Sequence, residues 1–224
     1  MPLPPLSDLQ YALFDWDNTL AESRSSLVAA VDQVLMEYHL PPWCESKNKR
    51  DRNLSFKDNF PNIFGAEADA AYARYRQIYL SIVDSKISSF PCAAEVLDFL
   101  SSQGIKLMIV TNKERCLLEH ELPLLYNPEL FSNIICGHEA PADKPSSEQI
   151  RYALRDYLPA AQITPHNSWM IGDSPQDSSA ALAANALPIR VHQSIWGDDI
   201  PLPESVRCFA DFAELLHAMQ LAKN

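Results

Sequence analysis

The feature that most limits the possible folds of this 224-residue chain is a series of short apolar runs separated by stretches with helical periodicity. Each run is almost continuously apolar, as in strands of a parallel sheet that helices cover on both faces. Such alternation of strands and helices is typical of an α/β protein, so we predict a doubly wound parallel sheet. The predicted strands are Tyr11–Phe14, Ile105–Val110, Asn133–Cys136, Trp169–Ile171, Leu187–Val191 and Val206–Phe209.

One interval is too long for this alternation. About 90 residues separate the first predicted strand from the second, whereas a strand–helix–strand unit needs only roughly 30. We therefore predict a helical insertion at 21–88 and a sheet domain formed by 1–20 and 89–224. Apolar side chains within the insertion recur at helical spacing around 27–38 and 72–82, which indicates two amphipathic helices.

Composition limits the class of protein. Hydrophobic residues make up 47% of the chain, as in an ordinary globular protein, and the formal net charge of −11 argues against a nucleic-acid partner. No apolar run approaches the roughly 20 residues needed to cross a bilayer, and the N-terminus does not resemble a secretory signal. The five cysteines show no close pairing and no CxxC spacing, so we expect reduced thiols in a cytoplasmic protein.

Polar side chains follow four of the predicted strands, at the edge where sites form in open α/β sheets. Asp15 and Asp17 come directly after the first strand. Two carboxylates so close in sequence repel each other unless a cation or a proton offsets their charge, and magnesium suits such hard oxygen ligands. A turn or a helix cap explains the same residues equally well.

The other three segments carry groups that suit phosphate or metal. Thr111 and Asn112 end the second strand, where a hydroxyl and helical amides can hold phosphate oxygens, although a plain helix cap is the simpler explanation. Lys144 offers a compact positive charge, but an isolated lysine is usually a solvated surface residue. Asp173 ends the fourth strand, and Asp177 also fits the capping-box pattern of a helix start.

In this order, the segments FDWDNT, VTN, KPSSE and IGDSPQD resemble the four motifs of the haloacid-dehalogenase superfamily. The spacing within the fourth motif and the insertion directly after the first are similar to the phosphoglycolate-phosphatase branch, which has a helical cap of C1 type. The resemblance covers essentially the whole sheet domain. It implies a Rossmann-like core, a magnesium cofactor and a small phosphate ester as substrate.

The resemblance also implies the catalytic and metal-binding roles. Asp15 would be the nucleophile that becomes phosphorylated, and Asp17 would protonate the leaving oxygen and then activate water. Asp15, Asp173 and the backbone carbonyl of Asp17 would hold magnesium.

The remaining motif residues are implied to bind or support the phosphoryl group. Thr111, Asn112 and Lys144 would contact its oxygens, and Asp177 would support Lys144 or the ligands of the metal. Two neighbours of the motifs have simpler explanations. Lys113 is expected to be a helix-surface lysine, with contact to the substrate as the alternative. Trp16 is expected to point away from the aspartates and either to pack in the core or to line the hinge of the cap.

The resulting prediction is a magnesium-dependent phosphatase that acts on a small phosphate monoester through an aspartyl phosphate. Two alternatives stay open. The first is a phosphomutase or a phosphonate hydrolase on the same scaffold, and the second is a non-catalytic, phosphate-dependent binding or signalling module. The motifs do not specify the substrate or the oligomeric state, because specificity is expected to depend on the insertion at 21–88.

Overall fold

The chain consists of two compact units, and the computed structural model describes most of both. The described residues are 2–44, 51, 54–192 and 203–223. The sheet unit comprises Met1–Ala21 and Ser89–Asn224, and the helical unit comprises Glu22–Ser88. No helix in these described ranges is long and apolar enough to cross a membrane.

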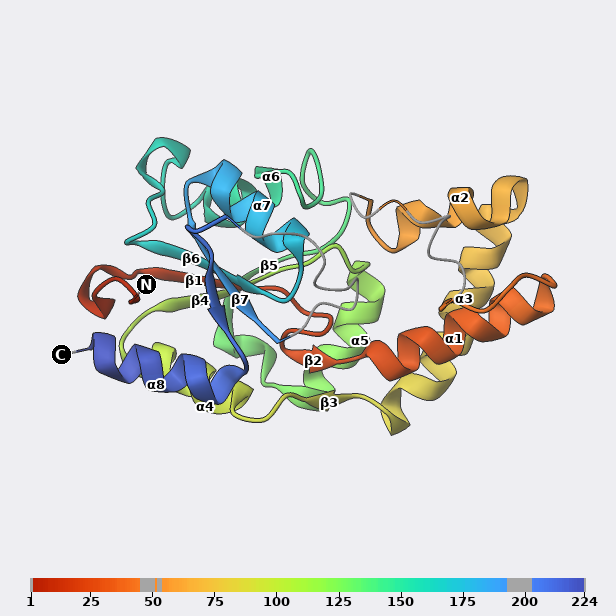
Figure 1. The fold of residues 1–224 in the computed structure, drawn as a ribbon, viewed down its shortest axis with the longest axis horizontal. Coiled ribbons are helices and arrows are strands. Elements are labelled where there is room, and N and C mark those ends of the chain that lie inside the picture. Colours follow the sequence, from red (N-terminus) through yellow and green to blue (C-terminus); the bar gives the residue numbers. More distant parts are fainter. Residues whose placement is uncertain (1, 45–50, 52–53, 193–202, 224) are drawn as a thin grey trace. The chain divides into compact units, whose positions relative to one another are not determined.

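A six-stranded parallel sheet forms the centre of the sheet unit within the described residues (Figure 1). Its strand order is β5-β4-β1-β6-β7-β8. The strands are β1 (Tyr11–Phe14), β4 (Lys106–Val110), β5 (Phe131–Ile135), β6 (Ser168–Gly172), β7 (Leu187–Val191) and β8 (Arg207–Phe209). Every residue of β1, β6 and β7 is buried, which explains why these runs are almost continuously apolar.

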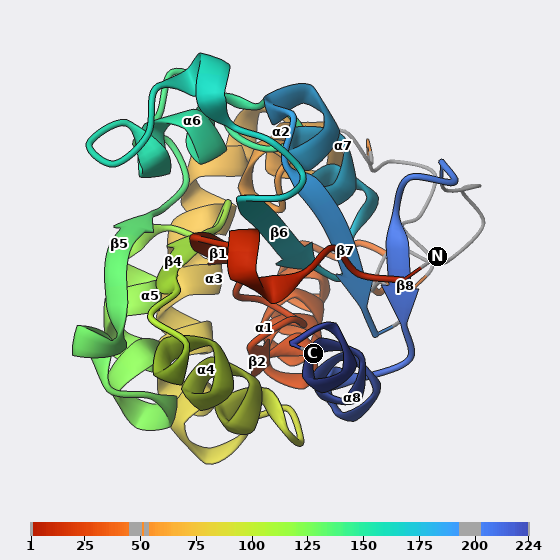
Figure 2. The ribbon, with the colours of Figure 1, turned by 90° about the vertical axis from the view of Figure 1, so that its left-hand side faces the viewer.

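Helices cover both faces of this sheet. They are α4 (Ala93–Ser102), α5 (Arg115–Leu125), α6 (Glu148–Leu154), α7 (Pro175–Ala184) and α8 (Phe212–Ala222). Helices α4 and α8 pack together on one face, and α6 and α7 pack together on the other (Figure 2). The core beneath α6 and α7 includes Leu13, Met108 and Met170 from the three central strands. The predicted doubly wound parallel sheet is confirmed.

Local contacts set the boundaries of two helices. Helix α7 begins at Pro175, ahead of the periodic apolar residues, because Ser174 caps it and Asp177 completes a capping box. Helix α6 ends at Leu154, where the backbone N–H of Tyr157 donates a 3₁₀-type hydrogen bond to the carbonyl of Leu154. Apolar spacing alone does not report either effect.

The register of the sheet aligns the ends of its three central strands. Phe14 pairs with Ile109 of β4 on one side and with Ile171 of β6 on the other. The loops that follow β1, β4 and β6 therefore begin at the same height on one edge of the sheet. In a parallel sheet this is the edge where ligand sites form.

The helical unit contains α1 (Arg24–Glu37), α2 (Phe60–Phe64) and α3 (Ala68–Ile82). Helix α1 packs against α3, so both amphipathic helices predicted in the insertion are present. Aromatic side chains fill the space between α2 and α3, where the ring of Phe60 lies 4.9 Å from that of Tyr72 and 5.8 Å from that of Tyr75. Two short strands, β2 (Ala21–Glu22) and β3 (Ser88–Ser89), pair where the chain passes between the units.

Adjacent residues of α1 should differ sharply in their contribution to stability. Leu35 is 0% exposed, whereas Met36 is 67% exposed. We expect Leu35→Ala to lower the free energy of unfolding by about 2–5 kcal/mol, because it leaves a cavity. Met36→Ala is the matched control and should change it by less than about 0.5 kcal/mol. Urea denaturation followed by circular dichroism measures both, and similar losses in the two variants would contradict the burial pattern.

Candidate active site

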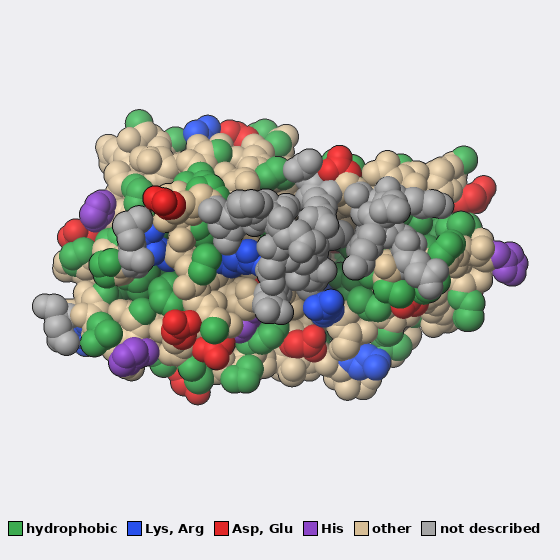
Figure 3. All heavy atoms as spheres, viewed as in Figure 1, with side chains coloured by type: hydrophobic (Ala, Val, Ile, Leu, Met, Phe, Trp, Pro, Cys, Tyr) green, Lys and Arg blue, Asp and Glu red, His purple; other side chains and the backbone are tan. Residues whose placement is uncertain are grey.

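Three carboxyl groups converge at the edge where β1 and β6 end. Asp15, Asp173 and Asp177 are all buried, and one oxygen from each lies within 4.8 Å of the others. By contrast, the acidic side chains on the face drawn in Figure 3 are spread over the surface. These three residues, here called the acidic cluster, form a local concentration of negative charge that needs a positive partner.

Lys144 supplies part of that positive charge. Its Nζ atom lies 2.7 Å from Oδ1 of Asp15 and 2.6 Å from Oδ1 of Asp177, and it donates to the carbonyl of Val110 at 2.8 Å. Burial favours the neutral amine, but the two carboxylates outweigh burial and raise the pKa of Lys144 above its usual value. The alternative of a solvated surface lysine is therefore wrong.

Lys144 alone does not offset the effects of burial and of the neighbouring carboxylates on Asp15. Burial raises the pKa of Asp15 to about 7, and the charges of Asp177 and Asp17 add to this effect, while Lys144 opposes it. A carboxylate attacks as a nucleophile only when it is ionised. The environment thus favours a further cation beside Asp15.

Asp177 is held by the start of α7. Its Oδ2 accepts hydrogen bonds from the backbone N–H of Ser174 at 3.0 Å and from the Ser174 hydroxyl at 2.6 Å, and its Oδ1 faces Lys144. Both oxygens thus already have donors from the protein. This arrangement suits a residue that fixes Lys144 better than one that binds metal directly.

Asp173 is oriented by a residue of the loop after β1. The amide of Asn18 donates to Oδ2 of Asp173 at 2.8 Å. Asn18 has a φ of 60°, in the left-handed region that asparagine tolerates better than most residues. The guanidinium Nε of Arg190 also donates to the backbone carbonyl of Asp173 at 3.1 Å. These contacts hold the loop after β6 from two sides, and the sequence motifs did not reveal them.

The second and third motif segments are joined by Asn112. Its amide nitrogen donates to the carbonyl of Lys144 at 2.8 Å, and its amide oxygen accepts from the Lys144 N–H at 3.0 Å. Gln149 adds a bond to the carbonyl of Thr111 at 3.1 Å. Asn112 therefore positions Lys144, and a direct contact between Asn112 and phosphate stays a prediction. Thr111 is buried at the end of β4, where its hydroxyl accepts from the N–H of Lys113 at 3.2 Å.

Lys113 corrects a prediction from the sequence, because it is buried rather than on a helix surface. Its Nζ lies 2.7 Å from Oδ1 of Asp17 and 2.9 Å from Oε1 of Glu121 on α5. Burial raises the pKa of Glu121, and Lys113 opposes that rise. Glu121 belongs to none of the motifs, but one feature of the sequence indicates that it is buried: it shares the apolar stripe of α5 with Leu117 and Leu122.

Trp16 lies in the same region. Its side chain is fully buried and packs edge-on against Tyr126, with the ring centroids 6.0 Å apart. The predicted packing role is confirmed. The indole N–H also donates to Oε2 of Glu121 at 2.6 Å, a contact that the sequence did not predict.

The donors around Asp15 fit a magnesium ion. The acidic cluster offers hard carboxylate oxygens and excess negative charge, which are the properties that bind Mg²⁺ in preference to softer metals. The raised pKa of Asp15 points the same way, because a bound cation favours the ionised carboxylate.

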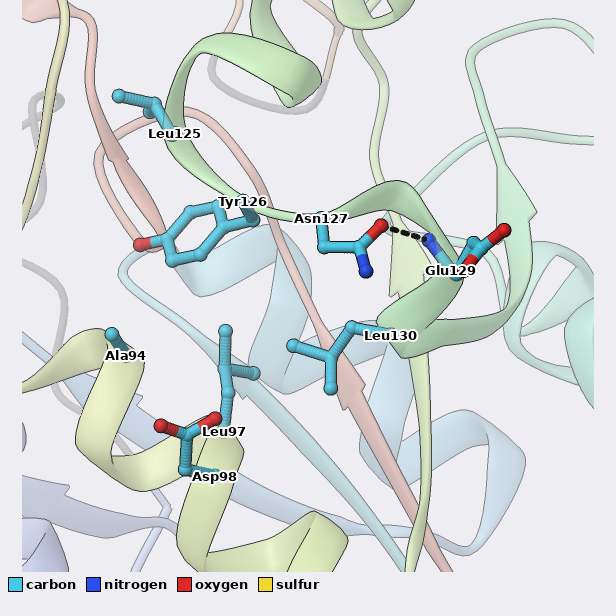
Figure 4. A pocket seen from close by; sticks show the side chains of 8 residues that line it. All are labelled: Ala94, Leu97, Asp98, Leu125, Tyr126, Asn127, Glu129 and Leu130. Carbon is cyan, nitrogen blue, oxygen red and sulfur yellow. Dashed lines mark hydrogen bonds between the residues drawn. The ribbon is translucent and has the colours of Figure 1, made fainter.

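A separate pocket of about 550 Å³ lies between α4 and the segment after α5 (Figure 4). Its lining residues are Ala94, Leu97, Asp98, Leu125, Tyr126, Asn127, Glu129 and Leu130. None of them belongs to the acidic cluster. This pocket is therefore distinct from the place where the carboxylates and Lys144 meet.

Comparison with known proteins agrees with the fold and the motif order. The family model described as haloacid dehalogenase-like hydrolase matches residues 12–191. The phosphoglycolate phosphatase of Neisseria gonorrhoeae is 30% identical over 198 residues, which cover 83% of this chain and 81% of that protein.

The phosphoglycolate phosphatase of Pseudomonas putida is 28% identical over 182 residues, covering 77% of this chain but only 65% of that relative, slightly less than two thirds. Among solved structures, a predicted phosphoglycolate phosphatase from Haemophilus somnus has a similar fold, with a TM-score of 0.78. It is 22% identical, and the match covers 94% of this chain and 97% of that one.

Gly172, the last residue of β6, should be essential for the position of Asp177. A Cβ atom at this position would overlap Cγ and Oδ2 of Asp177. We expect Gly172→Ala to lower the free energy of unfolding by about 1–3 kcal/mol, measured by urea denaturation. If the overlap is the cause, Gly172→Ala and Asp177→Ala should be less than additive in the double variant. Full additivity would contradict this explanation.

Proposed function

Because this chain belongs to the haloacid dehalogenase-like hydrolase family, we propose that it is a magnesium-dependent phosphatase that acts on small phosphate monoesters. The observation that carries this proposal is the contact of Lys144 with Asp15, directly after β1, and with Asp177 of α7. This contact places the ammonium group of Lys144 beside the Asp15 carboxylate, which must meet an anionic phosphate. Relatives named phosphoglycolate phosphatases make phosphoglycolate the first substrate to test.

In the proposed first step, an oxygen of Asp15 attacks phosphorus and the ester P–O bond breaks, so that the phosphoryl group is bound to Asp15. Asp17 gives a proton to the leaving oxygen, which departs as an alcohol. In the second step, Asp17 takes a proton from water as the water oxygen attacks phosphorus. Phosphate leaves, and the carboxylate of Asp15 is restored.

The chain's own donors offset the charge of the phosphoryl group in both steps. Lys144 already contacts Asp15, so its ammonium is placed to meet a phosphoryl oxygen that approaches the same carboxylate. Thr111 contributes a hydroxyl from the end of β4, one strand away from β1. Asn112 holds the backbone of Lys144 in place.

The residues proposed to hold magnesium are Asp15, Asp173 and the backbone carbonyl of Asp17. When bound, magnesium would offset negative charge on the phosphoryl oxygens and on Asp15. Asn18 keeps the carboxylate of Asp173 oriented through its hydrogen bond to Oδ2. Asp177 supports Lys144 from the capping box of α7.

The helical unit, Glu22–Ser88, is proposed to act as the cap that selects the leaving group. Support comes from its position in the sequence, directly after the first motif, and from its own core around Phe60. A cap would exclude bulk water during transfer of the phosphoryl group.

Release of inorganic phosphate from a panel of monoesters tests the proposed nucleophile. With magnesium present, Asp15→Asn should reduce phosphate release by roughly 10³-fold or more, because the amide cannot form the intermediate. Asp98→Asn, a change at an exposed residue of α4 outside the site, is the control and should keep wild-type activity. EDTA should abolish release by the wild type. No release from any ester, or full activity in Asp15→Asn, would overturn the proposal.

Magnesium should stabilise the folded protein more at higher pH. Burial raises the pKa of Asp15 from 3.8 to about 7. The metal-free folded state therefore keeps a proton that the unfolded state releases, so its stability falls as the pH rises from about 4 through about 7. Magnesium bound to the ionised carboxylates would offset this loss.

The measurement is the rise in melting temperature on adding magnesium, by differential scanning fluorimetry. It should be larger at about pH 8 than at about pH 5.5, because protons compete with the metal at the lower pH. Asp173→Asn should remove most of the rise at both values. An equal rise at both pH values, or an undiminished rise in Asp173→Asn, would contradict magnesium binding at this site.

A further inference from the structure

A second buried ion-pair network lies beside the acidic cluster. Lys113 contacts Asp17 at 2.7 Å and Glu121 at 2.9 Å, and the Trp16 indole donates to Glu121 at 2.6 Å. We call these four residues the Lys113 network. Only the Asp17 side chain is substantially accessible, at 25%, compared with 4% for Lys113 and 0% for Glu121.

The contacts of the network close a ring. Asp17 contacts Lys113, Lys113 contacts Glu121, Glu121 contacts Trp16, and Trp16 is bonded to Asp17 through the backbone. One carboxylate on α5 therefore anchors both the backbone of the loop after β1 and, through Lys113, the side chain of Asp17. A lysine side chain with a single partner on an accessible carboxylate would retain much rotational freedom. The second, fully buried partner removes that freedom.

Core packing alone does not account for Glu121. A charged side chain on the apolar stripe of a helix is costly to bury, and an apolar side chain of similar size often gives equal or greater stability. The position next to Leu117 and Leu122 would accept leucine on packing grounds. The buried negative charge of Glu121 is explained if it fixes the position of the Lys113 ammonium group.

We propose that Glu121 and Lys113 are positioning residues, which hold the Asp17 carboxyl where it can protonate the leaving oxygen of a phosphate ester. This inference rests on the proposed phosphatase function, in which Asp17 is the general acid. Trp16 contributes by fixing Glu121 and the loop that carries both aspartates. Lys113 itself does not serve as a substrate contact, because its side chain is 4% exposed and its Nζ atom is engaged by two carboxylates.

The test compares two esters that differ in their need for a proton. An alkyl ester, phosphoglycolate or glycerol phosphate, whichever the wild type hydrolyses faster, has a poor leaving group that needs protonation. Para-nitrophenyl phosphate has a good leaving group that departs with little assistance. The quantity compared is kcat/KM, because it reports the steps up to cleavage of the ester and not the later hydrolysis of the aspartyl phosphate.

Three variants and one control are measured with both esters. Glu121→Gln removes the charge that anchors Lys113, Lys113→Met removes the contact with Asp17, and the double variant combines them. The control is Glu139→Gln, which removes the charge of a partly buried glutamate that also forms an ion pair with α5, because Glu139 contacts Arg115 at 2.6 Å. The melting temperature of each variant establishes that it is folded.

General acid–base catalysis contributes about 10²–10⁴-fold, so we expect each single variant to lose roughly 10-fold or more in kcat/KM for the alkyl ester. The loss with para-nitrophenyl phosphate should be less than about 3-fold, as the proton contributes little there. The double variant should lose no more than Lys113→Met alone, because Glu121 acts through Lys113. Glu139→Gln should lower kcat/KM for both esters equally or not at all.

Equal losses with the two esters in Glu121→Gln and Lys113→Met would overturn the positioning role and leave only a structural one. Unchanged kcat/KM for both esters would also overturn it, as would losses that add fully in the double variant. These outcomes differ from failure of the proposed function, in which the wild type itself releases no phosphate from either ester. That last result would overturn the phosphatase proposal and this inference with it.

Discussion

The rest of the site depends on the ion pairs that the buried ammonium group of Lys144 forms. It is buried among Asp15, Asp177 and the carbonyl of Val110, so it links the loop before α6 to β1, β4 and the start of α7. Without this charge, three carboxyl groups within 4.8 Å of one another would repel or take up protons. Several features of the surrounding chain keep Lys144 in place, among them its two backbone hydrogen bonds with the Asn112 amide and the capping box that fixes Asp177.

Each of the two aspartates of the first motif forms an ion pair with a different lysine. Lys144 contacts Asp15, and Lys113 contacts Asp17, although the two aspartates are only two residues apart. Each lysine also contacts a second, more deeply buried carboxylate, which is Asp177 in one case and Glu121 in the other. The same arrangement is thus used twice: an anchored cation sets the position of a more accessible carboxylate. In the proposed chemistry, one of these carboxylates attacks phosphorus and the other handles the proton.

Much of the fold could be predicted because each part has a local signal. Continuous apolar runs indicate the buried strands, and the long interval after Asp15 indicates the insertion. The start of α7 at Pro175 depends on the capping box of Ser174 and Asp177 rather than on apolar spacing, and this pattern is also local in the sequence. The lysines show the limit of local signals most clearly. The order of the motifs predicts a role for Lys144, whereas no local pattern indicates that Lys113 is buried, because its two partners lie on other segments of the chain.

The sequence by itself determined the strands, the helical insertion and the order of the polar segments, because hydrophobic spacing and capping patterns act over a few neighbouring residues. Only the tertiary structure decided which segments meet. The strand order places β1 between β4 and β6, and this brings Asp15 and Asp173 to the same edge. It also decided the hydrogen bond from Asn18 to Asp173 and the buried partner of Trp16, Glu121. These contacts join residues more than 100 positions apart, and a single sequence carries no record of such distances in space.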